Sequence, residues 1–183
     1  MQETGTPTDA RAWLAEALER FERPLLAYAR RFTGDLDAAR DVVQDAFLKL
    51  CRSPLQPNDP RLGPWLFRVC RNRAIDHLRK LGPVHLWAEP DRVPAGDTFA
   101  SDTAAAHRDE KQRLQESVRE LPSSQGEAVW LKFHGDLSYR QIAEVMDVSV
   151  ANVGYLLHTA MGSLRRKLGA MSLSAAPAMR KTS

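Results

Sequence analysis

Cysteine is scarce in this sequence, and the patterns that would give it a chemical role are missing. Cys51 and Cys70 are the only two cysteines among 183 residues, and neither belongs to a CxxC pair. Isolated cysteines argue against a disulfide framework and a thiolate zinc site, and they fit the reducing cytoplasm. The five histidines are scattered, without the convergent spacing of a metal or catalytic site. We therefore expect no metal, no cofactor and no catalytic group.

Long apolar runs and a strong net charge are also missing. No apolar stretch approaches the roughly 20 residues of a membrane span. The opening "MQETGTPTDARAW" lacks the basic and then apolar segments of a secretory signal, so we expect a cytoplasmic protein without membrane insertion. The formal net charge is only +3, so any affinity for nucleic acid has to come from local clusters.

No stretch alternates convincingly as a β-strand, whereas apolar residues recur at three- and four-residue steps nearly throughout. Four helices are predicted in the first half of the chain. They run from Asp9 past Phe21, from Pro24 to near Gly34, from Asp35 or Asp37 to Arg52, and from near Trp65 to Gly82. Between the last two lies "SPLQPNDPRLGP", a loop rich in proline.

The composition changes between residues 83 and 109, which hold three prolines and more acidic than basic side chains. Such a segment predicts an extended linker. Helical periodicity resumes near Glu110. We therefore predict an all-α protein of two small helical domains, 9–82 and 110–168, joined by the acidic, proline-containing linker 83–109. Residues 1–8 and 169–183 are predicted to be flexible tails.

The segment "SYRQIAEVMD" followed by "VSVANVGYLLHTAMGSL" has the pattern of a helix-turn-helix. Ser138 is a good N-cap for the first helix, Asp147 tolerates the left-handed turn, and Ser149 can cap the second helix. The second helix carries an apolar stripe that includes Val153 and Leu157. An ordinary helical hairpin that packs a core is the alternative.

Residues 148–164 contain no Lys, Arg, Asp or Glu, which is unusual for a helix that reads DNA. Neutral side chains can nevertheless contact base edges, while flanking cations hold phosphates. Such a helix would bind duplex DNA weakly by itself.

Two earlier helices have opposite charge. The helix from Trp65 is basic and begins with aromatic residues, a composition that grips phosphates and stacks unpaired bases. The helix from Asp37 has a mixed acidic and apolar face, which suits a protein partner. The alternative in each case is a plain amphipathic helix with a solvated charged face.

Taken in order, these motifs resemble the extracytoplasmic-function branch of bacterial sigma factors, over about residues 15–168. "ARDVVQDAFLKL" resembles the segment of conserved region two that docks on core RNA polymerase. "WLFRVCRNRAIDHLR" resembles the helix that opens and reads the minus-ten promoter element, and "LPSSQGEAVWLKFHGDLSYRQIAEVMDVSVANV" resembles region four, which reads the minus-thirty-five element.

The resemblance implies three sets of site residues. The polymerase-binding set is Asp37, Asp41, Gln44, Asp45, Phe47 and Leu48. The minus-ten set is Arg61, Trp65, Arg68, Arg71, Asn72, Arg73, Asp76, Arg79 and Lys80. The minus-thirty-five set is Arg140, Ser149, Ala151, Asn152, Tyr155, His158, Thr159, Arg165 and Arg166.

The implied partners are the clamp and flap regions of core polymerase, promoter DNA and, by family analogy, an anti-sigma factor. The sequence departs from the family at Arg40, where Glu is common, and at Gly154, Tyr155 and Leu156, where Lys-Ser-Arg is common. The alternative is a stand-alone LuxR-type helix-turn-helix regulator, which leaves the polymerase-docking motif unexplained. No catalytic constellation supports a small enzyme, so we expect no reaction of its own.

Overall fold

The computed structural model describes residues 7–56, 58–80, 114 and 116–174 of the chain, and the side chains among them from residue 12 to residue 168. The predicted linker 83–109 lies outside the described residues, as do residues 1–6 and 175–183. The described parts are helices joined by turns, without a strand. The predicted all-α fold class is confirmed.

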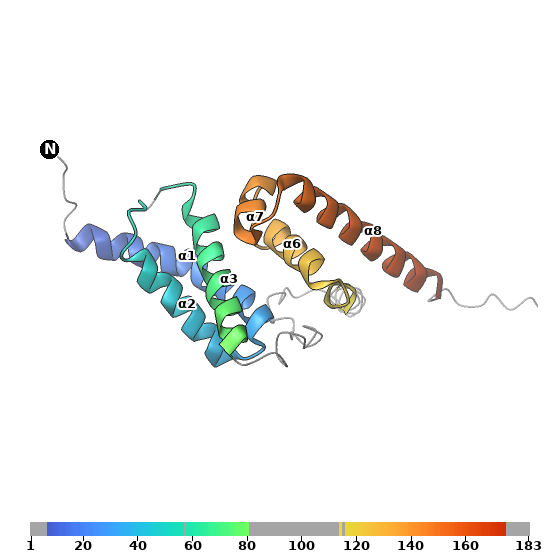
Figure 1. The fold of residues 1–183 in the computed structure, drawn as a ribbon, viewed down its shortest axis with the longest axis horizontal. Helices are drawn as coiled ribbons and strands as arrows, with labels where there is room; N and C mark the ends of the chain where they lie inside the picture. The colour runs from blue at the N-terminus through green and yellow to red at the C-terminus, as the bar shows by residue number, and fades with distance from the viewer. Residues whose placement is uncertain (1–6, 57, 81–113, 115, 175–183) are drawn as a thin grey trace, which may run out of the picture.

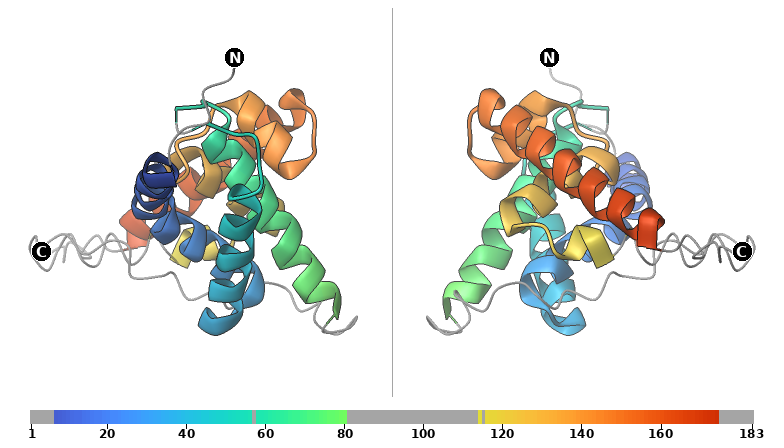
Figure 2. Two further views of the ribbon diagram at one scale, coloured as in Figure 1. Left: turned by 90° about the vertical axis from the view of Figure 1, so that its left-hand side faces the viewer. Right: turned by 90° about the vertical axis from the view of Figure 1, so that its right-hand side faces the viewer.

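Six helices form two bundles (Figure 1). The N-terminal bundle consists of α1 (Pro7–Thr33), α2 (Leu36–Leu50) and α3 (Leu62–Lys80), each packed against the other two. The C-terminal bundle consists of α6 (Ser123–Phe133), α7 (Tyr139–Met146) and α8 (Val150–Ser174). Seen from the end, α8 crosses α6, against which it packs (Figure 2).

The predicted helix boundary at Pro24 is wrong, because α1 continues through it. A proline inside a helix removes one hydrogen bond and costs about 3 kcal/mol. Here the apolar stripe continues on both sides of the proline, with Ala17, Leu25 and Tyr28 all buried. Burial of that stripe offsets the lost bond. The predicted end of the helix near Gly34 is confirmed, since Gly34 has a φ of +69° and its N–H donates to the Arg30 carbonyl over 3.0 Å.

Short-range caps fix the ends of α2 and α3. The Asp35 carboxylate accepts from the Ala38 N–H at 2.8 Å, so Asp35 is the N-cap of α2. Asp59 accepts from the Arg61 N–H at 2.8 Å just before α3. As a result α3 begins at Leu62, three residues before the predicted start at Trp65, with Pro64 in its first turn.

The helix-turn-helix geometry is as predicted. Ser138 and Gln141 form a reciprocal capping box at the start of α7. Asp147 ends α7 in the left-handed conformation with a φ of 57°. The Ser149 hydroxyl accepts from the Asn152 N–H at 3.1 Å and caps α8. The backbone of α8 continues to Ser174, past residue 168 where the sequence placed the end of the second domain.

The two bundles share one core. Buried side chains of both belong to a single cluster, and α3 packs directly against α7. Tyr28 and Phe67 of the N-terminal bundle meet Trp130 of the C-terminal bundle, and all three are buried. The functional surfaces therefore have to be considered together with this junction.

Candidate functional site

The acidic face of α2 is open to solvent. Asp37, Asp41 and Gln44 are exposed, and Leu48 is 52% exposed although it is apolar. Asp41, Gln44 and Leu48 lie at three- and four-residue steps, so they share one stripe of the helix. Phe47 differs from the rest of its predicted set, because its side chain packs in the core and is only 7% exposed. It shapes this face from beneath and offers no surface contact.

The basic face of α3 is partly free and partly paired within the N-terminal bundle. Arg68, Asn72 and Lys80 are exposed. Arg79 lies 3.7 Å from the Asp76 carboxylate, one turn away. Trp65 is half-buried against the core. The exposed members form a cationic surface that can hold phosphates.

Two further arginines of the predicted set have ion-pair partners near their own helix. Arg61 pairs with Asp59 at 2.7 Å, and its hydrogen bonds hold the pKa of Asp59 below the ordinary value. Arg73 pairs with Asp45 on α2. This second pair joins the acidic face of α2 to the basic face of α3. Since both partners are about a third exposed, it contributes at most about 1 kcal/mol.

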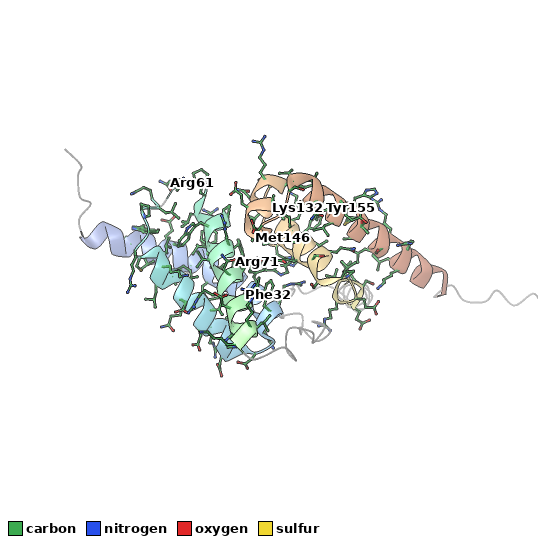
Figure 3. The ribbon with its side chains drawn as sticks, viewed as in Figure 1. Phe32, Arg61, Arg71, Lys132, Met146 and Tyr155 are labelled. Carbon is green, nitrogen blue, oxygen red and sulfur yellow. The ribbon has the colours of Figure 1, made fainter. Side chains whose placement is uncertain are left out.

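The uncharged face of α8 points to solvent, as predicted. Tyr155 is 66% exposed, and Ala151, Asn152 and His158 are also exposed. Behind them the predicted apolar stripe is buried; it consists of Val153, Leu156, Leu157 and Ala160. Figure 3 shows Tyr155 on the C-terminal bundle, away from the labelled Arg71 at the junction.

The remaining members of this set surround the neutral face. Arg140, Ser149, Arg165 and Arg166 are exposed, and Thr159 is half-buried. A Cβ at Gly154 would meet nothing within 4 Å, so glycine leaves open space on this side of the helix. The arrangement is a flat neutral surface with cations at both ends.

Arg71 is the one member of the minus-ten set that lies in the junction between the bundles (Figure 3). Its Nε donates to Glu127 Oε1 over 2.8 Å, and its side chain is only 20% exposed. The Tyr28 hydroxyl donates to the same oxygen over 2.6 Å. Burial acts to lower the pKa of Arg71, but the charge and hydrogen bond of Glu127 outweigh burial and raise it. The sequence prediction placed Arg71 on a DNA surface, and the structure pairs it inside the protein.

Aromatic rings surround this ion pair. The ring of Trp130 lies 5.1 Å from that of Tyr28 and 5.7 Å from that of Phe67, and His134 stacks on its other side at 5.4 Å. Burial, followed by the charge of Glu127, raises the pKa of Tyr28 well above its ordinary value. The phenol therefore remains a hydrogen-bond donor.

Arg31 is a second cation at the junction. A Cβ at Gly126 would lie 3.0 Å from an Arg31 guanidinium nitrogen, so glycine lets Arg31 approach α6 closely. Burial lowers the pKa of Arg31, while the charge of Glu127 acts in the opposite direction. Sequence reasoning missed Gly126 and Glu127, because no local pattern connects either residue to α1 or α3.

Groups typical of other kinds of site were searched for in the described residues. In that part of the chain no three His, Cys, Asp or Glu side chains are grouped to hold a metal ion. None of its helices combines the length and the apolar character needed to cross a membrane. Cys51 is exposed and Cys70 is buried, and both are free thiols.

Two family models match the chain in order. Residues 17–83 match Sigma-70 region 2, and residues 111–164 match Sigma-70, region 4. The first match covers α2, α3 and most of α1, and the second covers α6, α7 and most of α8. The two matched segments therefore contain all three candidate surfaces.

Relatives match across both segments. The chain is 25% identical over 150 residues to the ECF RNA polymerase sigma factor SigM of Bacillus subtilis, covering 82% of this chain and 91% of that protein. It is 24% identical over 161 residues to the ECF RNA polymerase sigma factor RpoE of Cereibacter sphaeroides, covering 86% and 87%.

Two solved structures share the fold. One is the sigma factor RpoE in complex with the anti-sigma factor NepR from Bartonella quintana, at 21% identity and a TM-score of 0.60, covering 88% of this chain and 98% of that chain. The other is CnrH in complex with the cytosolic domain of CnrY, at 22% identity and a TM-score of 0.52, covering 91% and 98%.

Proposed function

The chain belongs to the extracytoplasmic-function branch of the sigma-70 family, and from this premise we propose how its surfaces divide the work of a sigma factor. It binds core RNA polymerase and directs promoter-specific initiation. The LuxR-type alternative is not supported, because the match to region 2 over residues 17–83 lies outside any helix-turn-helix. The observation that carries the function is that both regions occur, in the family's order, in one chain.

The exposed face of α2 docks on core polymerase. Asp37, Asp41, Gln44 and Leu48 offer acceptors and one exposed apolar side chain, and Asp45 lies at the edge of this face in its pair with Arg73. An apolar centre with charged neighbours is a composition suited to a protein partner. Phe47 contributes by supporting the helix from the core.

The face of α3 captures the opened minus-ten element. Arg68, Arg79 and Lys80 supply phosphate contacts, Asn72 supplies an amide, and Trp65 supplies a ring for stacking an unpaired base. Arg61 lies before the helix and Arg73 beside it, so both extend the same cationic surface once DNA competes for their carboxylate partners. Flipping a base out costs a few kcal/mol, which these contacts have to offset.

The neutral face of α8 reads the minus-thirty-five element. Ala151, Asn152, Tyr155, His158 and Thr159 are placed for base edges, and Arg140, Ser149, Arg165 and Arg166 for phosphates. Because the reading face has no charge, its own affinity for duplex DNA is weak. Delivery on polymerase raises its effective concentration at the promoter and makes weak reading sufficient.

Four further features complete the proposal. The chain carries out no reaction of its own, and it acts in the cytoplasm, where polymerase and promoters are. Domain boundaries at 9–82 and 110–168, joined by the linker 83–109, fit the two matched segments. An inhibitor protein of the anti-sigma kind is a further partner, since both structural neighbours were solved with a bound regulatory chain.

Purified transcription tests the function. Core polymerase with this chain should initiate at specific promoters, and neither component alone should do so. A matched reaction uses the chain with Asp41→Lys and Gln44→Ala, which should lose initiation while its helicity is unchanged. Promoter-specific binding by the chain without core, together with no initiation when core is added, would contradict the sigma assignment and favour a stand-alone regulator.

A further inference from the structure

The packed bundles are too close together to occupy both promoter elements. The elements named minus-ten and minus-thirty-five are about 25 base pairs apart, which is about 85 Å along B-form DNA. In the protein, α3 packs on α7, and α8 follows α7 after a short turn. A helix rises about 1.5 Å per residue and packs 8–10 Å from its neighbour, so α3 lies within about 50 Å of the start of α8. The bundles must separate before both surfaces reach DNA.

A specific set of side chains holds the bundles together. We call it the interdomain cluster: Tyr28, Phe67, Arg71, Glu127 and Trp130. The three rings supply apolar contact across the junction. The Glu127 carboxylate accepts two hydrogen bonds on one oxygen, from Arg71 on α3 and Tyr28 on α1. A buried carboxylate is costly unless it is paired in this way, so the contact is selective for these partners.

The same cluster withholds Arg71 from other ligands. Its Nε is committed to Glu127, and Asp147 at the end of α7 adds a second negative charge nearby. A guanidinium that donates to a buried carboxylate cannot at the same time donate to DNA. The closed arrangement therefore removes a cation from the surface of α3.

We propose that the interdomain cluster is an autoinhibitory contact, in which Glu127 occupies Arg71 and keeps the two reading surfaces together until core polymerase separates the bundles. This inference rests on the proposed function. In the free chain the closed state predominates, and the open state binds core. The apparent affinity for core is therefore the open-state affinity reduced by the fraction of open chain.

Charge changes at Glu127 test the contact with a matched control. Glu127→Gln keeps the shape and removes the charge, and Glu127→Lys places a cation beside Arg71 and Arg31. Glu144→Gln and Glu144→Lys change the net charge by the same amounts at an exposed position on α7. The control pair corrects for any general gain in affinity for DNA or polymerase that comes from added positive charge.

Separation of the bundles can be measured by electron–electron distance between two nitroxide labels. One label goes on Cys51, which is exposed on the N-terminal bundle, and the other on Ser124→Cys, an exposed position on α6. Cys70 stays unlabelled, since burial raises the pKa of its thiol to about 12. The parent chain and both Glu144 variants should give one short, narrow distance. Glu127→Lys should give a longer, broader distribution, with Glu127→Gln between them.

Affinity for core polymerase tests inhibition itself. Glu127→Lys should bind core about tenfold more tightly than the parent chain, which corresponds to about 1.4 kcal/mol. Tyr28→Phe removes one hydroxyl and keeps the ring, so it should change affinity in the same direction by a smaller factor. Circular dichroism shows that each variant retains its helices.

Two results would overturn the proposal: unchanged label distances in Glu127→Lys, or separated bundles with unchanged affinity for core. Neither result touches the proposed function, which is judged by initiation with the parent chain at saturating core. Conversely, absence of promoter-specific initiation by every variant would reject the sigma function, while the label distances still report on the contact.

Discussion

Arg71 and Arg79 lie about two turns apart on α3 but have different surroundings. Arg79 is exposed and lies 3.7 Å from Asp76 on its own helix. Arg71 is held by Glu127 from the other bundle. Two arginines assigned to one DNA surface therefore differ in what must happen before they can reach DNA.

Alanine at these two positions should have separable effects. Arg79→Ala should reduce open-complex formation on duplex promoter about tenfold, roughly 1.4 kcal/mol, with affinity for core unchanged. Arg71→Ala should reduce opening as well, but it should also tighten binding to core, because it releases Glu127. Both losses should shrink on a template already mismatched across the minus-ten region. Equal losses on the two templates would assign these arginines to folding or docking.

His134 should report on the closed state through its pKa. Burial against the rest of the protein, followed by the positive charge of Arg31, holds the pKa of His134 below its ordinary value. Protonation is thus disfavoured when the bundles are packed. The contribution to the closed state is complete above the ordinary pKa of about 6.5 and is lost as the pH falls through the lowered pKa.

The measurement is an NMR titration of the His134 ring. Arg31→Gln removes the cation from α1 and should raise the apparent pKa of His134. Glu127→Lys, which separates the bundles, should restore it toward the ordinary value. The same apparent pKa in the parent chain and in Arg31→Gln would show that Arg31 does not face the ring in solution.

Among the elements, α2 should be the polymerase-docking helix. Asp41→Lys with Gln44→Ala should weaken binding to core by at least tenfold, since reversed charge on a docking face costs more than a lost contact. Both positions are exposed, so the fold should stay intact. Glu19→Lys with Glu22→Ala, on the exposed side of α1, is the matched control. A titration with core that does not distinguish the two double variants would refute the assignment.

The two kinds of residue on α8 should fail differently. Substitution of Asn152, Tyr155 or His158 should cost about 1–3 kcal/mol and relax preference at one base pair. Substitution of Arg165 or Arg166 should weaken all sequences about evenly and flatten the salt dependence. Transcription from single-base variants of the upstream element measures both effects.

Gly154 adds a steric test on the same helix. Gly154→Leu should keep the fold, because a side chain there meets nothing within 4 Å. It should nevertheless abolish use of the upstream element, since it blocks close approach to the groove. If variants of the neutral residues leave the ranking of base changes untouched, α8 is a protein surface and not the reader.

Local signals predicted most of the helix ends and failed where tertiary packing dominates. Asp35, Ser138, Asp147 and Ser149 all have the capping roles that their residue types predict, because a cap is formed within a few residues of chain. Pro24 was expected to end a helix, and α1 passes through it because buried side chains on both sides hold it together. Propensity is a weak signal against such packing.

For the whole molecule, the order of the bundles was predictable and their junction was not. Periodicity identifies Tyr28 and Trp130 as apolar positions, but it does not say which buried surface each one meets. Glu127 has the sequence character of a surface residue. Its partners lie 56 and 99 positions away, and only the folded chain brings them together. The same distance along the chain explains why Arg71 was assigned to the surface.

Trp130 gives the molecule an optical property. Its indole lies among Tyr28, Phe67 and His134, where the surroundings are apolar and close. Indole emission moves to longer wavelength when water replaces such neighbours, and excitation absorbed by a tyrosine this near passes efficiently to the indole. The colour of the emitted light would therefore follow each encounter with polymerase in real time, on the natural chain and without any attached dye.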